Sequence, residues 1–426
     1  MSGPRVWVLG GGGREHALVA ALLRSPSHPS VVAAPGNPGF PPEVERRSLD
    51  LSDPEAVVEA VGDADLVVVG PEAPLVAGVS NRLRAAGIPV LGPSSAAARL
   101  EGSKAFAKTI MDEVGVPTAR WARFEEAGPA KAFARTLDGG AVIKADGLAA
   151  GKGVVVAEDL AAADAAIDAL LSGSHGEAGR ALVVEERLEG EELSVLALCD
   201  GRRLAWLPPA QDHKRLEEGD GGPNTGGMGA YCPAPVGTEA LVRTVLERCM
   251  QPVVDRLADA GTPLVGVLYA GVMVTADGPK VLEYNVRFGD PEAQAILPLV
   301  DEDPLELFLA AARGALEARA VRVRPGAALV VVLAAAGYPA DPRRGDLLEG
   351  LDEAARVPGA MVFHAGTALD EAGRFRTAGG RVLGVTGIGA DFAEARERAY
   401  AAAERVRFAG CQLRRDIGHR ALAARP

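Results

Sequence analysis

The amino-acid sequence predicts a multidomain chain of mixed α/β and α+β class. Three observations indicate this: short apolar runs alternate with helical patterns over the first hundred residues, glycine-rich turns follow several of these runs, and a late strand carries polar side chains on one face. We expect an N-terminal open parallel α/β domain at residues 1–102 and a second domain at residues 103–324, with a flap subdomain at about 120–192. A small C-terminal α+β domain should occupy residues 325–426.

The composition limits the class of protein. With 426 residues, 48% hydrophobic, 24% charged and 4% aromatic, the chain has the composition of an ordinary globular protein of several domains. A net charge of −12 argues against a nucleic-acid-binding surface, whereas a local basic pocket could still bind small anions. The four cysteines show no CxxC spacing, so we expect no zinc site or disulfide framework and a reducing cytoplasmic location. No signal-like segment or long apolar run is present, so neither export nor membrane insertion is expected.

The first element is a buried strand at residues 6–9, followed by four glycines and a helix that starts at residue 14. Glycines let the backbone approach an anion, and the free N–H groups of the helix hold it. Plain phosphate binding, a structural tight turn and NAD binding remain open interpretations. The dinucleotide pattern GxGxxG is not met, because its third glycine would fall at Glu15 or His16, and the next strand is followed by Pro-Gly-Asn rather than by an acid for the ribose.

Two further strands end in turn residues. The strand at residues 66–69 leads into Gly70-Pro71-Glu72, and the strand at residues 88–91 leads into Gly-Pro-Ser. In an open parallel sheet, ligands bind at the carboxyl ends of the strands. We therefore expect these loops and the first glycine loop to meet at one site.

Two lysines and a glycine-rich loop come next. Lys104 lies in the first turn of a helix at residues 103–114, an unfavourable place for a cation unless an anion is near. Lys144 ends a strand at residues 141–144, before the segment ADGLAAGKG. The segment is not a P-loop, because GKG replaces GK[ST] and the chain returns into a strand at residues 154–156. A glycine-rich loop between antiparallel strands is instead typical of a flap that closes over the phosphates of a nucleotide.

Acidic residues then flank a short apolar linker between strands at residues 182–186 and 193–198. Carboxylates in such a place suit an adenine amino group and ribose hydroxyls. The stretch at residues 211–229 is the richest in turn residues, which indicates a functional loop. His213 in this stretch could act as a general base, but a turn residue surrounded by charge is the favoured interpretation.

The strand at residues 281–288 carries the most informative pattern. Alternation places Glu283, Asn285 and Arg287 on one face and apolar side chains, beginning with Leu282, on the other. A carboxylate, a neutral oxygen donor and a guanidinium suit Mg²⁺ and the phosphates of a nucleotide, although a solvated strand face is the alternative. A Gly-Asp-Pro-Glu turn with two more carboxylates follows. Beyond it we expect a helix near residues 305–318, a linker at 321–325, and C-terminal strands at 328–333 and 382–385 with a helix at 391–406.

Seven strings occur in one order along nearly the whole chain: GGGGREHAL, VGPEAPL, EGSKAF, VIKADGLAAGKGV, QDHKR, GPNTGGMGAY and RFGDPE. Together they resemble the phosphoribosylamine-glycine ligase family, also called glycinamide ribonucleotide synthetases, of the ATP-grasp superfamily. The resemblance implies that ATP phosphorylates the carboxylate of glycine, and that 5-phosphoribosylamine attacks the acyl phosphate to give glycinamide ribonucleotide, ADP and phosphate in purine biosynthesis. It implies ATP and Mg²⁺ or Mn²⁺ as cofactors, small molecules as partners without nucleic acid or membrane, and a monomeric, cytoplasmic enzyme.

The resemblance also implies roles for individual residues. Contacts to ATP would come from Lys104, Lys144, Gly147, Gly151, Lys152, Gly153, Glu185, Glu186, Leu188 and Glu192. Contacts to the other substrates would come from Gly11, Gly12, Gly13, Arg14, Glu15, Gly70, Pro71, Glu72, Asp212, Lys214, Asn224, Thr225, Gly226, Arg287 and Pro291. The catalytic residues would be Arg287, Asp212 and Lys144, and the metal ligands Glu283 and Asn285.

One departure concerns the metal. Many ATP-grasp enzymes place another glutamate on the strand before the metal strand, but this chain has Gly271 and apolar neighbours there. We expect fewer protein ligands per metal, with water completing the shell. Two other classes of function stay open: a sibling ATP-grasp ligase or carboxylase that acts on another acid, and a nucleotide sensor without catalysis.

Overall fold

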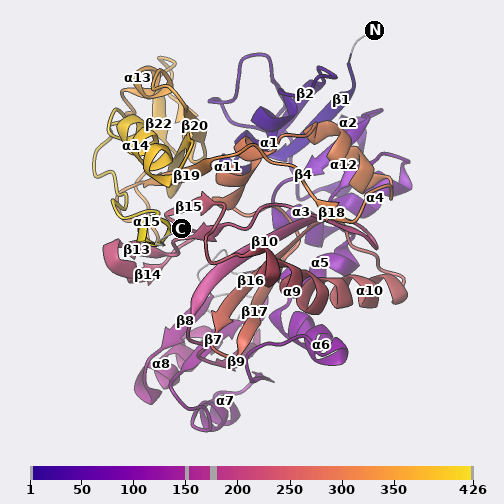
Figure 1. The fold of residues 1–426 in the computed structure, drawn as a ribbon, viewed down its shortest axis with the longest axis vertical. Helices are drawn as coiled ribbons and strands as arrows, with labels where there is room; N and C mark the ends of the chain where they lie inside the picture. Colours follow the sequence, from indigo (N-terminus) through magenta and orange to yellow (C-terminus); the bar gives the residue numbers. More distant parts are fainter. Residues whose placement is uncertain (1–2, 149–152, 173–179, 424–426) are drawn as a thin grey trace.

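The computed structural model describes residues 3–148, 153–172 and 180–423. The predicted fold class is confirmed: an N-terminal parallel sheet, a two-part central region and a C-terminal α+β unit follow one another along the chain. In Figure 1 the N-terminal and C-terminal units lie side by side at the top, and the flap subdomain lies at the bottom, below the long strands of the central sheet. No helix in the described part of the chain has the length and apolarity needed to cross a membrane.

The N-terminal sheet has the order β3-β2-β1-β4-β5, and all its strands are parallel. Its strands are β1 (Arg5–Gly10), β2 (Ser30–Pro35), β3 (Glu45–Arg46), β4 (Leu66–Val69) and β5 (Val90–Leu91). Its helices are α1 (Gly13–Leu22), α2 (Pro54–Val61), α3 (Glu72–Ala77), α4 (Val79–Ala85) and α5 (Ser95–Gly102). Strands β1 and β4 are apolar and buried on both faces, as a sheet covered by helices requires. The carboxyl ends of β1, β4 and β5 therefore share one edge, as the sequence predicted.

The flap subdomain is a four-stranded sheet of order β6-β9-β7-β8, packed against two helices. Its elements are β6 (Trp121–Phe124), α7 (Ala127–Ala134), β7 (Ala141–Ala145), β8 (Val154–Ala157), α8 (Leu160–Leu171) and β9 (Leu182–Glu186). Strands β7 and β8 pair in an antiparallel register, as expected for a glycine-rich hairpin. Of the residues predicted to contact ATP, Gly151 and Lys152 lie outside the described residues.

The central sheet has the order β17-β16-β10-β11-β18. Its strands are β10 (Glu191–Asp200), β11 (Leu204–Trp206), β16 (Val265–Thr275), β17 (Gly278–Asn285) and β18 (Arg319–Ala320). The accompanying helices are α6 (Lys104–Val114), α9 (Glu239–Val245), α10 (Gln251–Asp259), α11 (Glu292–Ile296) and α12 (Pro304–Ala312). Helix α12 ends well before the predicted residue 318, because the chain turns at Gly314, whose φ of +72° is left-handed.

Strand β17 departs from strict alternation. Gly271 pairs with Glu283 but Val272 pairs with Val281, so Leu282 is an extra residue in a β-bulge. The expectation that Leu282 faces away from the polar side chains is wrong, since it lines the same cavity as Glu283. The bulge also frees the Leu282 carbonyl, which accepts a hydrogen bond from Lys144 Nζ at 3.0 Å.

The C-terminal sheet is built from two separate parts of the chain, in the order β12-β15-β19-β23-β20. Strands β12 (Gln211–Asp212) and β15 (Gly229–Cys232) belong to the turn-rich stretch, whereas β19 (Ala327–Ala334), β20 (Ala360–His364) and β23 (Arg381–Gly389) come later. The unit is completed by β13 (Arg215–Glu217), β14 (Gly221–Asn224), α13 (Leu351–Ala355), β21 (Thr367–Leu369), β22 (Phe375–Thr377), α14 (Phe392–Ala403) and α15 (His419–Ala423). Because β15 pairs with β19, the sheet extends across the domain boundary expected at residue 324.

Candidate active site

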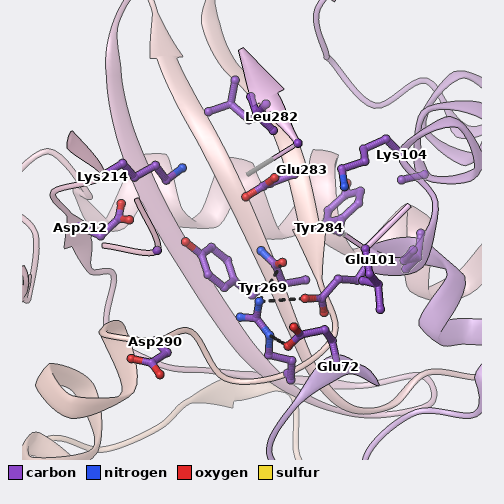
Figure 2. A pocket seen from close by; sticks show the side chains of 18 of the residues that line it. Glu72, Glu101, Lys104, Asp212, Lys214, Tyr269, Leu282, Glu283, Tyr284 and Asp290 are labelled. Atoms are coloured by element: carbon purple, nitrogen blue, oxygen red, sulfur yellow. Dashed lines mark hydrogen bonds and ion pairs between the residues drawn. The ribbon is translucent and has the colours of Figure 1, made fainter. Parts of the chain in front are cut away.

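A cavity of about 380 Å³ opens where the three units meet, and its lining comes from all of them. The predicted site residues in its wall are Arg14, Glu72, Lys104, Gly153, Asp212, Lys214, Thr225, Gly226, Glu283, Asn285 and Arg287. Figure 2 shows the acidic and basic side chains converging on one space above the long strands. The structure thus brings residues separated by more than 250 positions into one site.

Other predicted residues lie outside the wall itself. These are Gly11, Gly12, Gly13, Glu15, Gly70, Pro71, Lys144, Gly147, Glu185, Glu186, Leu188, Glu192, Asn224 and Pro291. Several of them hold wall residues in place, as described below. Residues in the wall that the sequence analysis did not select include Glu101, Lys108, Tyr269, Asp290, Glu292 and Arg381. Asp290 and Glu292 were visible as turn carboxylates, but nothing local marked Tyr269 or Arg381.

Arg287 is held by carboxylates from two other elements. Its Nη2 lies 2.8 Å from Glu101 Oε1, and its Nε lies 3.4 Å from Glu72 Oε2. Burial disfavours the guanidinium charge, but the carboxylates of Glu101 and Glu72 outweigh it and raise the pKa of Arg287 above its usual range. Figure 2 labels Glu101 and Glu72, and its dashed lines mark the ion pairs of their carboxylates. Arg287 is therefore a fixed positive group that remains charged.

At the other end of the cavity, Glu185 holds two lysines. Glu185 Oε1 lies 2.9 Å from Lys144 Nζ, and Glu185 Oε2 lies 2.9 Å from Lys108 Nζ. Burial raises the pKa of Glu185, but Lys144 and Lys108 lower it by more, so the carboxylate is ionised. The carboxylate of Glu185 is only 2% exposed and lies between the two ammonium groups, and its expected contact with adenine or ribose stays a prediction.

Lys104 joins helix α6 to the base of the flap hairpin. Its Nζ donates to the Gly147 carbonyl at 2.6 Å, and the neighbouring Ser103 Oγ donates to Asp146 Oδ1 at 2.8 Å. Burial lowers the pKa of Lys104, against the opposing attraction of Glu283. The position that looked unfavourable for a cation is explained by these acceptors, which offset the helix dipole.

Glu283 and Asn285 present two oxygen donors to the cavity, and Figure 2 labels the Glu283 carboxylate. Burial raises the pKa of Glu283, but the ammonium groups of Lys214, Lys144 and Lys104 lower it by more, so the carboxylate is charged. One carboxylate and one amide oxygen suit a hard divalent cation. In the described part of the chain, no group of three or more His, Cys, Asp or Glu side chains is placed to hold a metal. The donor set therefore fits an ion that brings most of its own ligands.

The acidic side chains of Asp212 and Glu292 lie in the cavity wall with Lys214, and we call them the Asp212 floor. Burial raises the pKa of Asp212 to about 8 against the attraction of Lys214, and nearby Glu292 adds to the rise. Tyr269 donates its hydroxyl to Glu292 Oε1 at 2.6 Å. Glu192, expected at the ribose, accepts a hydrogen bond from Lys214 Nζ. The floor offers carboxyl oxygens to an ammonium group of a small substrate, whose positive charge would favour the ionised form of Asp212.

The first glycine loop contains its own anion. The carboxylate of Glu15 accepts the Gly12 N–H at 2.7 Å and Arg14 Nε at 2.6 Å, and the residue is only 3% exposed. A Cβ at Gly70, in the loop after β4, would lie 2.1 Å from Glu15 Oε1. This position therefore requires a glycine, because the Glu15 carboxylate packs against it. The Glu15 carboxylate and the Gly12 N–H thus bond to each other, and their expected contacts with a substrate stay predictions. Arg14 remains in the cavity wall.

His213 is buried away from the cavity. Its Nε2 accepts the Gly418 N–H at 3.1 Å, and its Nδ1 lies 3.8 Å from Asp220. The structure therefore agrees with a turn residue among charges and not with a general base.

Comparisons with known proteins agree along the whole chain. Sequence profiles of phosphoribosylglycinamide synthetase match with the N domain at residues 4–101, the ATP-grasp (A) domain at 102–293 and the C domain at 328–420. The chain is 49% identical to the phosphoribosylamine-glycine ligase of Mesorhizobium japonicum over 420 residues, 98% of each protein. It is 50% identical to the chloroplastic phosphoribosylamine-glycine ligase of Arabidopsis thaliana over 418 residues, 96% of this chain and 79% of that protein.

Solved structures of similar fold agree with these sequence matches. The crystal structure of phosphoribosylamine-glycine ligase from Thermotoga maritima superimposes with a TM-score of 0.85 at 35% identity, covering 97% of this chain and 99% of that one. The biotin carboxylase domain of the 2-oxoglutarate carboxylase from Hydrogenobacter thermophilus has a TM-score of 0.71 at 16% identity and covers 97% of this chain and 92% of that one. The second likeness is one of fold alone.

Proposed function

The chain belongs to the phosphoribosylglycinamide synthetase family, and from this premise we propose that its cavity joins glycine to 5-phosphoribosylamine with ATP as the energy source. The observation that carries the proposal is the composition of one continuous wall. It combines lysines beside the flap hairpin, the Glu283 and Asn285 oxygens, the Asp212 floor, and Arg14 and Glu72 from helices α1 and α3 of the N-terminal unit. Each group suits a different reactant of a carboxylate-amine ligase.

The reaction is divided between these groups. A carboxylate of glycine attacks the γ-phosphorus of ATP and forms an acyl phosphate, while the bond to ADP breaks. The amine of 5-phosphoribosylamine then attacks the acyl carbon and the new C–N bond forms. The C–O bond to the phosphate breaks with its electron pair on the phosphate, and the nitrogen gives up one proton to that leaving group. Lys104 and Lys144 stabilise the negative charge on the ATP phosphates, and the fixed guanidinium of Arg287 stabilises the acyl phosphate. The Asp212 floor receives the ammonium group of glycine.

The divalent ion would be held by Glu283 and Asn285, with phosphate oxygens and water as its other ligands, and would neutralise charge on the phosphoryl group. We take Mg²⁺ as the ion, with Mn²⁺ able to replace it. Arg14 and the loops at the carboxyl ends of β1 and β4 would bind the phosphoribosyl group. We further propose that the enzyme acts as a cytoplasmic monomer without nucleic-acid or membrane partners.

The direct test is an incubation with ATP, Mg²⁺, glycine and freshly prepared phosphoribosylamine. We expect ADP, phosphate and glycinamide ribonucleotide in equal amounts, and no product when glycine is omitted. AMP and pyrophosphate would contradict the acyl phosphate route. Turnover with another carboxylic acid but not with glycine would identify a sibling ligase, and ATP binding without phosphate release would identify a sensor.

Gly12→Val should raise the KM for phosphoribosylamine by about ten- to a hundredfold, because small displacements of a binding loop are costly. A Cβ at Gly12 would lie 2.8 Å from Glu15 Oε2, so the Glu15 carboxylate that accepts the Gly12 N–H must shift. Steady-state kinetics with each substrate varied in turn gives the measurement. Gly128→Val is the matched control, since a Cβ there meets nothing within 4 Å. A larger rise in the KM for ATP than for phosphoribosylamine would mean that the two binding regions have been exchanged.

A further inference from the structure

A buried asparagine lies between the first glycine loop and the C-terminal unit. Asn37 follows β2 and is 3% exposed. Its Nδ2 donates to the Gly11 carbonyl at 3.2 Å and to the Ala365 carbonyl at 2.7 Å. Its Oδ1 accepts the Gly39 N–H at 2.8 Å and the Thr367 hydroxyl at 2.9 Å. Both donors and both acceptor sites of the amide are used, so Asn37 has no capacity left for a ligand.

These bonds connect parts of the chain that are far apart in sequence. Gly11 follows β1 in the N-terminal sheet, whereas Ala365 lies in the turn after β20 and Thr367 is the first residue of β21. The glycine loop is tightly packed here, since a Cβ at Gly11 would lie 2.3 Å from the Gly36 carbonyl oxygen. A displacement of Asn37 is therefore passed to the backbone of Gly11 rather than absorbed by free space.

The Thr367 hydroxyl contacts the imidazole of His364, whose backbone is held by the imidazole of His16. Thr367 has one hydroxyl proton, which it donates to Asn37. In the 3.0 Å contact between Thr367 Oγ1 and His364 Nδ1, the ring N–H must therefore be the donor and the hydroxyl oxygen the acceptor. The backbone N–H of His364 donates to His16 Nδ1 at 2.8 Å, and His16 lies in α1 just after the glycine loop. Burial lowers the pKa of His364 to about 4 and, with repulsion from His364, that of His16 to about 3. Both rings are neutral at physiological pH, so the hydrogen bonds keep their direction.

We propose that Asn37 is a positioning residue through which the C-terminal unit sets the geometry of the Gly11 loop, so that phosphoribosylamine binding depends on the hydroxyl of Thr367. The proposal rests on the proposed function, because it assumes that this loop binds the phosphoribosyl group. According to this proposal, the C-terminal unit contributes to the affinity for phosphoribosylamine through Asn37 and Thr367, which do not touch the substrate. ATP binding, which uses the opposite end of the cavity, is independent of this link.

The test compares Thr367→Val with Thr367→Ser. Valine has the shape of threonine but cannot donate to Asn37, whereas serine keeps the hydroxyl. Thr367→Val should raise the KM for phosphoribosylamine and the Kd for glycinamide ribonucleotide by about three- to tenfold, with the KM for ATP changed by less than about twofold. Thr367→Ser should match the wild type. A lower Tm for Thr367→Val with unchanged KM and Kd would show that the link only stabilises the fold and would overturn the proposal, as would equal rises for ATP and phosphoribosylamine.

A double-mutant cycle identifies the route. If Thr367 acts through Asn37, Thr367→Val should have no further effect on the Kd for glycinamide ribonucleotide in an Asn37→Ala background. Additive effects would contradict the proposed route. The wild-type assay separates the two proposals: a wild type that makes no glycinamide ribonucleotide defeats the proposed function, whereas an active wild type with an unaffected Thr367→Val variant defeats only the role of Asn37.

Discussion

Replacing Glu283 by glutamine should remove most turnover, by roughly a hundredfold or more, while the protein stays folded. The amide keeps the shape of the carboxylate, so the bulged strand β17 and its packing are retained. The substitution removes the negative charge of Glu283, a carboxylate that the ammonium groups of Lys214, Lys144 and Lys104 keep ionised. Without it, the divalent ion that accompanies ATP loses the only anionic member of the two-residue donor set. Steady-state kinetics at saturating ATP and thermal unfolding give the two readouts.

Glu239→Gln is the matched control for this change, because its carboxylate is 88% exposed and lies on α9. Calorimetry on the nucleotide-free wild type adds a readout independent of activity. Since one carboxylate and one amide make a sparse site, Mg²⁺ alone should bind weakly, and Glu283→Gln should change that binding little. Micromolar binding to the free protein would require further acidic ligands, with Asp290 and Glu292 the first to test.

Lys144→Met should cost about 2–4 kcal/mol of transition-state stabilisation, measured as the fall in kcat/KM for ATP. The methionine side chain fills the same space, but the positive charge next to Glu283 is lost. The fold should survive, because Glu185 keeps its ion pair with Lys108. Thermal unfolding should therefore change far less than the rate does.

Two comparisons make the Lys144 experiment specific. Lys131→Met removes a flap lysine whose partner Asp168 is 58% exposed, and it should leave kcat/KM unchanged. Lys108→Met removes the other partner of Glu185. If the only role of Lys144 were to balance the charge of Glu185, Lys144→Met and Lys108→Met would lose equal activity. We expect a larger loss for Lys144→Met, and an unchanged rate in that variant would exclude Lys144 from the reaction.

The participation of the C-terminal unit changes how the site is understood. Arg381 of β23 enters the cavity wall and donates Nη1 to the Asp290 carbonyl at 2.6 Å. Burial lowers the pKa of Arg381, but Asp290, Tyr338 and Glu292 together raise it by more, so the guanidinium stays charged. Together with Asn37 and the sheet pairing of β15 with β19, this contact makes the C-terminal unit part of the site rather than an appendage.

The sequence by itself determined the local elements and the chemical types in the site. Apolar runs and glycine turns predicted the parallel sheet and its three loops, because strand period and turn chemistry act over a few residues. Glu283, Asn285 and Arg287 do lie together in the cavity wall, although the alternation that grouped them wrongly placed Leu282 on the other face. The family resemblance supplied the reaction, which the comparisons support.

Only the tertiary structure decided which partners these residues have. Glu15 closes its own glycine loop, and Glu185 binds two lysines, since a buried carboxylate is stable only where hydrogen bonds and cations surround it. The bulge at Leu282 follows from the register between β16 and β17. Arg381 reaches the cavity because two distant segments complete one sheet. Such pairings depend on packing between segments that are far apart in the chain, and no local pattern encodes them.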